Sequence, residues 1–397
     1  MVVSSFLIYF FSFFISVCAC YWYEKIDDSY ANKKENKQRL YFLRLRLFKA
    51  DILKFLCAIF VLIPPIFLTV FRGLDVGTDN HMYLIMYDKY KVYDVFEYLD
   101  IYYPAGIFPA EVGYHELQRI SYIIDGGYNF LKFLCGFLII FFVWRGIVYY
   151  HKKFGINSGL CLSLYYLSLF SFSLNIVRFS IALAIFFYSF QFVLEKKLFR
   201  YIAWCVVMWS FHVSLVVAPV FYLLNFSMSA NSKKFWKYFA LILVVLVWLL
   251  SRVVVSTFIP YLSNVVNRLS TYVIAVPSST GIGVYLICAL ILLPLLRWDS
   301  FLIKHNSWSA VLLMCTMYVP IRFLAYYEQT LVRLSYIPLI ITIVLYSGLS
   351  RLPISIGEAH FWKFYTILVF IGYYIMATIV EGSMCVYPYI FDLTNHY

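Results

Sequence analysis

Charged residues are scarce in this chain of 397 residues. Only 13% of them are charged and 63% are hydrophobic, whereas about a quarter of a soluble domain is charged. The nine cysteines show no paired metal spacing, which argues against a disulfide scaffold and a zinc site. No basic residue precedes the first apolar run, so this run lacks the start of a cleavable signal peptide and is interpreted as a retained span. These absences exclude a soluble enzyme and favour a polytopic integral membrane protein.

Long apolar runs predict an all-α fold with about ten transmembrane helices. A helix needs about 20 apolar residues to cross the hydrocarbon core of a bilayer. Such runs lie near residues 2–22, 53–71, 129–150, 158–174, 176–194, 236–257, 284–297, 307–325, 329–349 and 361–380. The sequence shows no polar linker and no clear repeat, so we expect residues 1–397 to form a single membrane domain.

Basic residues between the runs predict the topology. Nine Lys or Arg residues lie between positions 24 and 54, and short basic loops of this kind stay in the cytoplasm. The chain then begins outside, and the segment 72–128 forms a large extracytoplasmic (periplasmic) loop. The net charge of +12 is explained by such topological residues, so no nucleic-acid partner is expected.

The apolar stretch 199–225 is interpreted as a re-entrant pair of half-helices with a turn near His212. It is too short for two full crossings. A single crossing is the alternative, but it would place the basic residues that follow, such as Lys233 and Lys237, outside. Non-helical backbone at membrane depth is tolerated where protein or water covers it.

The outer loop 72–128 supplies most of the carboxylates available outside. It holds nine of the chain's 20 acidic residues. Apolar and tyrosine side chains recur at helical spacing in 80–99 and again in 111–124, which predicts two amphipathic helices on the membrane surface. The tyrosines would either form an interfacial belt or stack on sugar rings.

The start of this loop crowds Arg72, Asp75 and Asp79 behind the second apolar run. Thr78 and Asp79 would serve as N-caps of the following helix. Arg72 would snorkel from the end of its span, with Asp75 as a partner. Capping does not explain two carboxylates and an arginine in so short a segment, so the segment is also a candidate site.

Three further side chains interrupt apolar runs. Arg178 follows Asn175 at the start of one run, and Arg333 lies within another. Arginines in such places usually face a cavity and mark a functional path, and converging arginines hold phosphate oxygens through planar paired donors. His212 would be either a neutral buried histidine bonded to a carbonyl or a catalytic group.

Several of these short motifs follow one another in a recognisable order. They are Arg72, Asp75, Gly77, Thr78, Asp79, Tyr83 and Tyr87, then Glu111 to Tyr114, Asn175 to Arg178 with Ile181 and Ala182, Phe211 to Ser214, and Arg333 with Tyr336. This combination resembles the EpsG-like branch of the Wzy-type O-antigen polymerases over about residues 50–340. One departure is Phe179, where that branch often has glutamine.

The resemblance implies an enzyme that joins undecaprenyl-pyrophosphate-linked oligosaccharide repeats into O-antigen or related surface polysaccharide at the periplasmic face of the bacterial inner membrane. Expected partners are the lipid-linked oligosaccharide, membrane lipid and, as a further candidate, a chain-length regulator. No cofactor is expected and no metal is required, because arginines can neutralise the phosphates. The candidates for base or acceptor positioning are Asp79, Glu111 and His212. Those for binding pyrophosphate or glycan are Arg72, Asp75, Tyr83, Arg178 and Arg333.

Other functions stay open at this point. An O-antigen ligase would use similar lipid-pyrophosphate chemistry and a similar outer loop. A membrane-bound O-acyltransferase also has many spans and a buried histidine, but not beside an outer acidic loop. A lipid-linked oligosaccharide flippase would carry its charges along a cavity reachable from both faces, whereas nearly all non-topological charge here lies on one face. A structural assembly subunit is the least specific alternative.

Overall fold

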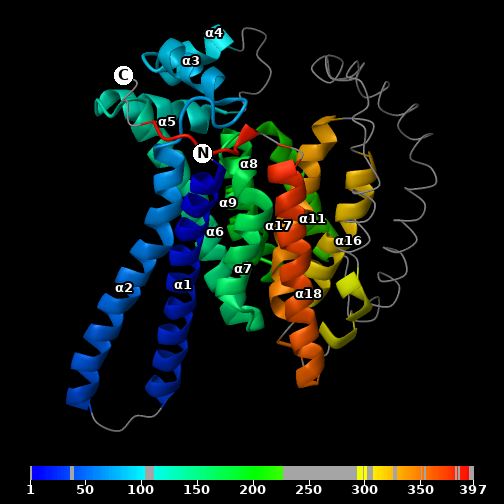
Figure 1. The fold of residues 1–397 in the computed structure, drawn as a ribbon. Helices are drawn as coiled ribbons and strands as arrows, with labels where there is room; N and C mark the ends of the chain where they lie inside the picture. Colours follow the sequence, from blue (N-terminus) through cyan, green and yellow to red (C-terminus); the bar gives the residue numbers. More distant parts are fainter. Residues whose placement is uncertain are drawn as a thin grey trace. The chain divides into compact units, whose positions relative to one another are not determined.

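The protein is described from a computed structural model (Figure 1). The structure describes residues 2–35, 40–102, 111–226, 293–297, 299–301, 307–324, 329–349, 351–352, 355–380, 382 and 385–392. Within these residues the chain forms helices and no β-strand, and an isolated antiparallel β-bridge joins Arg72 to Phe391. The prediction of an all-α membrane protein is therefore confirmed.

The chain divides into two compact units. Unit 1 comprises Met1–Gln191, Ala203–Leu215 and Phe370–Tyr397, and unit 2 comprises Phe192–Ile202 and Val216–Val369. The helices that lie in unit 1 or begin there are α1 (Val2–Glu35), α2 (Leu40–Val70), α3 (Asn80–Tyr90), α4 (Val95–Tyr102), α5 (Val112–Ile123), α6 (Gly127–Phe154), α7 (Ser158–Tyr165), a π-helix (Tyr166–Phe170), α8 (Ser171–Ser173) and α9 (Val177–Leu194). The later helices are α10 (Leu198–Phe211), a 3-10 helix (Val213–Val217), α11 (Ala218–Phe226), a 3-10 helix (Leu293–Arg297), α16 (Trp308–Leu324), α17 (Gln329–Leu349), α18 (Ile356–Tyr374) and a π-helix (Ile375–Val380). The prediction of a single membrane domain stays a prediction.

Six helices among the described residues are long and apolar enough to cross a membrane. They are Ser5–Ser29, Ala50–Val70, Gly127–Phe154, Val177–Leu194, Val332–Leu349 and Ile356–Val380. Two further predicted runs correspond to shorter apolar helices, Ser158–Ser173 and Trp308–Arg322. The predicted span 236–257 and most of 284–297 lie outside the described residues. The number of about ten spans therefore stays a prediction.

The expected loop 24–54 is largely helical, because α1 continues to Glu35 and α2 begins at Leu40. Ion pairs hold this end of unit 1 together. Asp27 lies 2.6 Å from the Lys54 ammonium and 3.0 Å from the Lys152 ammonium. We call this the Lys54 end of unit 1.

The opposite end of α1 and α2 is covered by residues 385–392. The carbonyl of Ile390 accepts a hydrogen bond from the Gly73 N–H at 2.7 Å. The Tyr389 hydroxyl donates to the carbonyl of Leu68 at 2.8 Å, and the Tyr9 hydroxyl donates to that of Val386 at 2.8 Å. Figure 1 shows this last segment passing beside the N-terminus. We call this the Arg72 end.

The stretch 199–225 contains a break where the sequence predicts one. Helix α10 ends at Phe211, and a 3-10 helix and α11 follow. The Tyr201 hydroxyl donates to the carbonyl of Ala218 at 2.8 Å, and the Tyr201 ring stacks on that of Tyr222. The chain thus folds back on itself after His212. That both ends face the cytoplasm stays a prediction.

Helices α6 and α9 pack closely in unit 1 because Gly146 has no side chain. A Cβ at position 146 would lie 2.6 Å from the Phe187 ring, so the ring would have to move. The Tyr150 hydroxyl also donates to the carbonyl of Phe187 at 2.6 Å. In contrast, a Cβ at Gly372 meets nothing within 4 Å.

We expect Gly146→Ala to lower the free energy of unfolding by about 1–3 kcal/mol, the usual cost of overpacking. Gly372→Ala is the matched control and should be neutral or slightly stabilising, since alanine favours helices over glycine. Thermal unfolding of the purified protein in detergent measures both. Equal melting temperatures for the two variants would contradict the packing described here.

Candidate functional site

The segment after α2 is anchored on the start of α9. Gly77 has a φ of 100°, which glycine adopts readily, and a Cβ there would lie 3.1 Å from the carbonyl oxygen of Leu174. The Asp79 N–H donates to Asn175 Oδ1 at 2.8 Å, and Asn175 Nδ2 donates to Thr78 Oγ1 at 2.9 Å. A single asparagine side chain therefore holds the turn that carries Asp79.

The capping interpretation of Asp79 is wrong. Asp79 occupies the N-cap position of α3, but its side chain makes no capping hydrogen bond. Its Oδ1 instead accepts a hydrogen bond from the Thr78 hydroxyl at 3.1 Å. The backbone of this turn is held by Asn175, and the Asp79 carboxylate contacts the Thr78 hydroxyl rather than the N–H groups of α3.

Arg178, in the first turn of α9, forms an ion pair with Glu111. Its guanidinium also lies 5.5 Å from the Tyr83 ring and 5.8 Å from the Tyr114 ring. A cation held over an aromatic face gains about 0.5–2 kcal/mol, the larger value when water is excluded. Two rings and one carboxylate therefore stabilise a charge that would be costly at the start of an apolar helix.

Glu111 itself adopts an uncommon backbone conformation. Its φ is 89° in the left-handed region, although it is not glycine, and such strain costs on the order of 1–3 kcal/mol. Its carbonyl accepts the N–H groups of Tyr114 and His115, both at 3.1 Å. The strained turn starts α5 and directs the Glu111 side chain to Arg178.

Helix α5 also meets the end of α10. A Cβ at Gly113 would lie 2.5 Å from Ser210 Oγ, so the serine side chain would have to move. The next residues lead to His212, which is buried and meets the Phe179 ring edge-on at 5.3 Å. His212 Nδ1 accepts the N–H of Ser214 at 3.1 Å, so in a neutral imidazole the proton is on Nε2.

Five of the residues singled out from the sequence thus lie in one neighbourhood of unit 1. They come from the turn before α3, from α3, from the start of α5, from the start of α9 and from the end of α10, and they are Asp79, Tyr83, Glu111, Arg178 and His212. We call them the Arg178 cluster. The structure brings them together without testing their roles.

Within unit 1, Asp75 and Arg72 lie outside this cluster. Asp75 is exposed and pairs with the exposed His81 rather than with Arg72. Arg72 does not snorkel to the surface, because it is only 1% exposed beside residues 385–392. Its Nη2 lies 3.5 Å from Asn80 Oδ1. Arg333 belongs to α17 in unit 2, so its predicted place beside pyrophosphate stays a prediction.

Lys132 was not identified from the sequence, although a lysine inside the predicted span 129–150 is a signal of function. It is buried, and its ammonium donates to the carbonyl of Arg72 at 3.3 Å. It also lies 5.4 Å from the Tyr128 ring, whose hydroxyl donates to Asn80 Oδ1. A buried lysine and a buried arginine therefore lie side by side at the Arg72 end.

Burial controls the titration of the two tyrosines beside Arg178. It raises the pKa of Tyr83 and, more strongly, that of Tyr114, and the opposing effect of the nearby guanidinium is smaller. Both phenols are therefore neutral at physiological pH. Each keeps a hydroxyl proton that can be donated to a bound oxygen.

One group of metal-ligating side chains is present among the described residues, at the Lys54 end. It comprises Glu24, Asp28 and His151, with ligand atoms within 4.8 Å of one another. His151 Nε2 lies 3.0 Å from Asp28 Oδ1, and Glu24 accepts the N–H of Ser158 at 2.8 Å. Direct contacts of His151 with the two carboxylates explain this group, which belongs to the opposite end of unit 1 from the Arg178 cluster.

We expect Asn175→Ala to release the turn that carries Asp79. The Asp79 N–H would lose its acceptor, so its amide hydrogen should exchange faster, by about tenfold for a lost bond near 1.4 kcal/mol. Thr78→Ala is the milder control, because the bond from the Asp79 N–H to Asn175 is kept. Hydrogen exchange followed by mass spectrometry of peptides covering 73–80 measures this. Unchanged protection in Asn175→Ala would contradict the anchoring role.

A second expectation concerns pH and the contact between α4 and α5. His115 is buried, its ring stacks 4.0 Å from that of Tyr98, and its Nε2 bonds to the carbonyl of Tyr93 at 3.1 Å. Burial lowers the pKa of His115. Below about pH 6.5, the usual histidine pKa, the protein with the α4–α5 contact broken binds more protons than the protein with this contact intact. The contact is therefore stable above this pH and is lost as the pH falls through the lowered pKa.

Hydrogen exchange of α4, corrected for the intrinsic effect of pH on exchange, should accelerate in acid. His115→Gln should remove this acid-dependent change, whereas His81→Gln, at an exposed histidine, should leave it intact. An acid response that survives in His115→Gln would show that another group controls the contact.

Comparison with known proteins supplies one finding on the family. The chain matches the model of the EpsG family over residues 54–391, which is most of its length. No curated protein and no solved structure matches it. The family match and the apolar helices fit a membrane polysaccharide polymerase. The chain therefore belongs to the EpsG family, a family of Wzy-like polysaccharide polymerases.

Proposed function

We propose that this protein is a membrane glycosyltransferase that joins undecaprenyl-pyrophosphate-linked oligosaccharide repeats into O-antigen or a related surface polysaccharide. It would act at the periplasmic face of the bacterial inner membrane. The observation that carries the proposal is the convergence of two carboxylates, an arginine and a histidine in the Arg178 cluster. The family match supports the same conclusion.

The reaction needs a base and a positive charge. A hydroxyl of the acceptor repeat attacks the anomeric carbon of the growing glycan, and the bond from that carbon to the pyrophosphate oxygen breaks. The hydroxyl proton passes to a base, and undecaprenyl pyrophosphate leaves with the bonding electrons. Proton acceptance by a positioned side chain and stabilisation of the leaving charge are the two contributions expected from the protein.

Arg178 and Glu111 supply these contributions as a pair. Without substrate, each charge neutralises the other. Pyrophosphate oxygens offer the planar guanidinium a stronger bidentate partner, so substrate binding draws Arg178 away from Glu111. The carboxylate is then a better proton acceptor than it was inside the ion pair. Binding of the donor and activation of the base are thereby coupled.

The remaining residues position the two substrates. Asp79, fixed by Asn175, is the second candidate base. His212 would orient the acceptor, and the hydroxyls of Tyr83 and Tyr114 would donate to substrate oxygens. Arg333 stays a candidate second contact for pyrophosphate. Arg72 contributes indirectly, because its guanidinium contacts Asn80 next to Asp79.

We expect Arg178→Ala and Glu111→Gln to abolish long polymer while the protein still inserts normally. Loss of a general base lowers rates by about 10²–10⁴-fold. Surface polysaccharide separated by gel electrophoresis should then show at most one repeat on its lipid core. Asp88→Asn is the matched control, since Asp88 is an exposed α3 carboxylate paired with Lys91. Long polymer from either variant at normal protein levels would contradict the proposal.

The same gels separate the competing functions. Loss of a ligase leaves no repeat on the core, whereas loss of a polymerase leaves one. Purified protein that joins lipid-linked repeats in detergent, where there are no two sides, would exclude transport as the main activity.

A further inference from the structure

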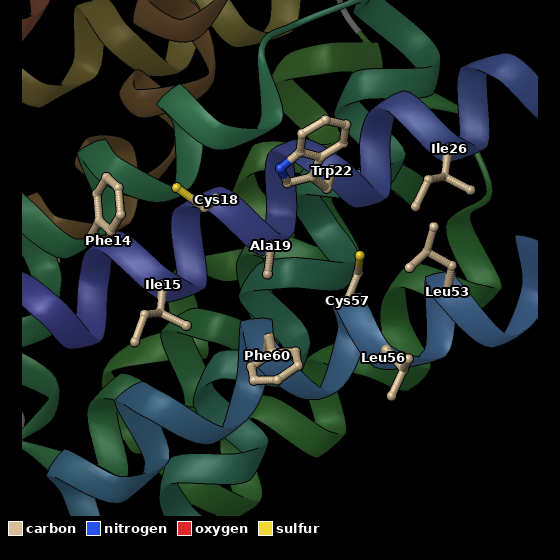
Figure 2. Close-up of a pocket in the computed structure, with 10 residues that line it drawn as sticks. All are labelled: Phe14, Ile15, Cys18, Ala19, Trp22, Ile26, Leu53, Leu56, Cys57 and Phe60. Carbon is tan, nitrogen blue, oxygen red and sulfur yellow. The ribbon is translucent and has the colours of Figure 1, made fainter.

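An apolar groove runs along the pair formed by α1 and α2. Near the Lys54 end it opens into a cavity of about 530 Å³, lined by Phe14, Ile15, Cys18, Ala19, Trp22, Ile26, Leu53, Leu56, Cys57 and Phe60 (Figure 2). Nearer the Arg72 end a second cavity of about 400 Å³ is lined by Leu7, Ile8, Phe11, Ser12, Ile63, Pro64, Phe67, Leu68 and Phe391. Nearly all these side chains are apolar, and many are half exposed.

The two cavities are successive parts of one groove. On α1 the lining residues recur every three or four positions from Leu7 to Ile26, and on α2 they do so from Leu53 to Leu68. This spacing places each set on one face of its helix. Figure 2 shows side chains from both helices along the part nearer the Lys54 end. At a rise of about 1.5 Å per residue, Leu7 to Ile26 spans about 28 Å.

That length decides what kind of chain could fill the groove. The hydrocarbon core of a bilayer is about 30 Å thick, so an acyl chain from one leaflet reaches about half of it. The groove follows nearly the whole thickness. A single occupant must therefore be one apolar chain longer than the acyl chain of an ordinary phospholipid.

The Arg72 end of the groove offers positive charge. Phe391, which lines this end, is bridged through its backbone to Arg72. The Nε and Nη1 atoms of Arg72 are buried without a hydrogen-bond partner among the described residues. Lys132 donates to the Arg72 carbonyl, and Asp392 is the acidic residue that interacts with Lys132. The Arg72 guanidinium therefore keeps two nitrogen atoms whose N–H groups can bind phosphate oxygens.

The same end is continuous with the Arg178 cluster. Arg72 Nη2 lies 3.5 Å from Asn80 Oδ1, and the neighbouring Asp79 N–H bonds to Asn175. A lipid whose apolar chain lies in the groove therefore has its head at the end of unit 1 where the cluster lies.

We propose that the groove between α1 and α2 binds the polyprenyl chain of the lipid-linked glycan, with the phosphate-bearing head at the Arg72 end. This inference rests on the proposed function. It adds a site for the apolar part of the substrate. This site holds one very long chain rather than two short ones. Binding there fixes the lipid before its pyrophosphate reaches the Arg178 cluster.

Photolabelling of the full chain in phospholipid nanodiscs tests the groove. The probe is undecaprenyl phosphate with a diazirine in its terminal isoprene unit, and labelled residues are mapped by mass spectrometry. Because the head lies at the Arg72 end, labels should concentrate near the Lys54 end of the groove, within 14–26 and 53–60. Cys18→Trp, which fills the groove, should lower this labelling by about tenfold, since an indole takes the place of the buried isoprene surface. Cys18→Ala should keep it.

Gly372→Trp is the matched control, because it adds the same side chain where a Cβ at Gly372 meets open space. It should leave labelling unchanged. Ile15→Trp narrows the groove from a half-exposed position and should reproduce the loss, so the test does not depend on the folding of one variant. A diazirine in an acyl chain of phosphatidylglycerol should label the exposed face of α18 as strongly as the groove.

Three results would overturn the inference. The polyprenyl probe could label α18 and the groove equally, or its labelling of the groove could survive both tryptophan variants. The third result is that the phosphatidylglycerol probe labels the groove more strongly than it labels α18. The same preparation is assayed for polymer. If it joins lipid-linked repeats but the probe ignores the groove, this inference fails and the proposed function stands. If the probe labels the groove but no polymer forms, the proposed function fails and the groove remains a polyprenyl site.

Discussion

Arg178 stands in the first turn of a buried, almost wholly apolar helix, and its charge needs partners there. Glu111, whose strained backbone starts α5, forms an ion pair with it, and the Arg178 guanidinium lies 5.5 Å from the Tyr83 ring and 5.8 Å from the Tyr114 ring. The helices that supply these side chains are short and follow α2. Their arrangement is therefore tied to one guanidinium, and a substrate that engages this guanidinium acts on all of them at once.

The apolar runs predicted most of the described long helices, since a membrane-length segment has few other ways to satisfy its backbone. The ends of the helices could not be predicted in this way. The basic residues after the first run suggested a loop, but Asp27 pairs with Lys54 and Lys152, and α1 and α2 continue past their apolar parts. The break after Phe211 was predictable because 199–225 is too short for two crossings.

For the site, residue type and order pointed to Asp79, Tyr83, Glu111, Arg178 and His212, which the structure places together. The same reasoning treated Arg72 and Asp75 as neighbours, yet one is buried beside Asn80 and the other is exposed beside His81. The separation of two residues in the sequence says little about the directions in which their side chains point from an irregular turn. The role of Asn175 as the anchor depends on a contact between distant segments, which no local pattern reveals.

The covering of Arg72 by residues 385–392 has a consequence for biogenesis. The Tyr389 hydroxyl bonds to the carbonyl of Leu68 across 321 positions of the chain. The first two helices therefore enter the membrane long before their last partners are synthesised. Until those residues arrive, the backbone groups of Phe71 and Gly73 must be served by water or by the insertion machinery. Unit 1 is thus completed by its latest-made part, which makes loss of that segment more damaging than its length suggests.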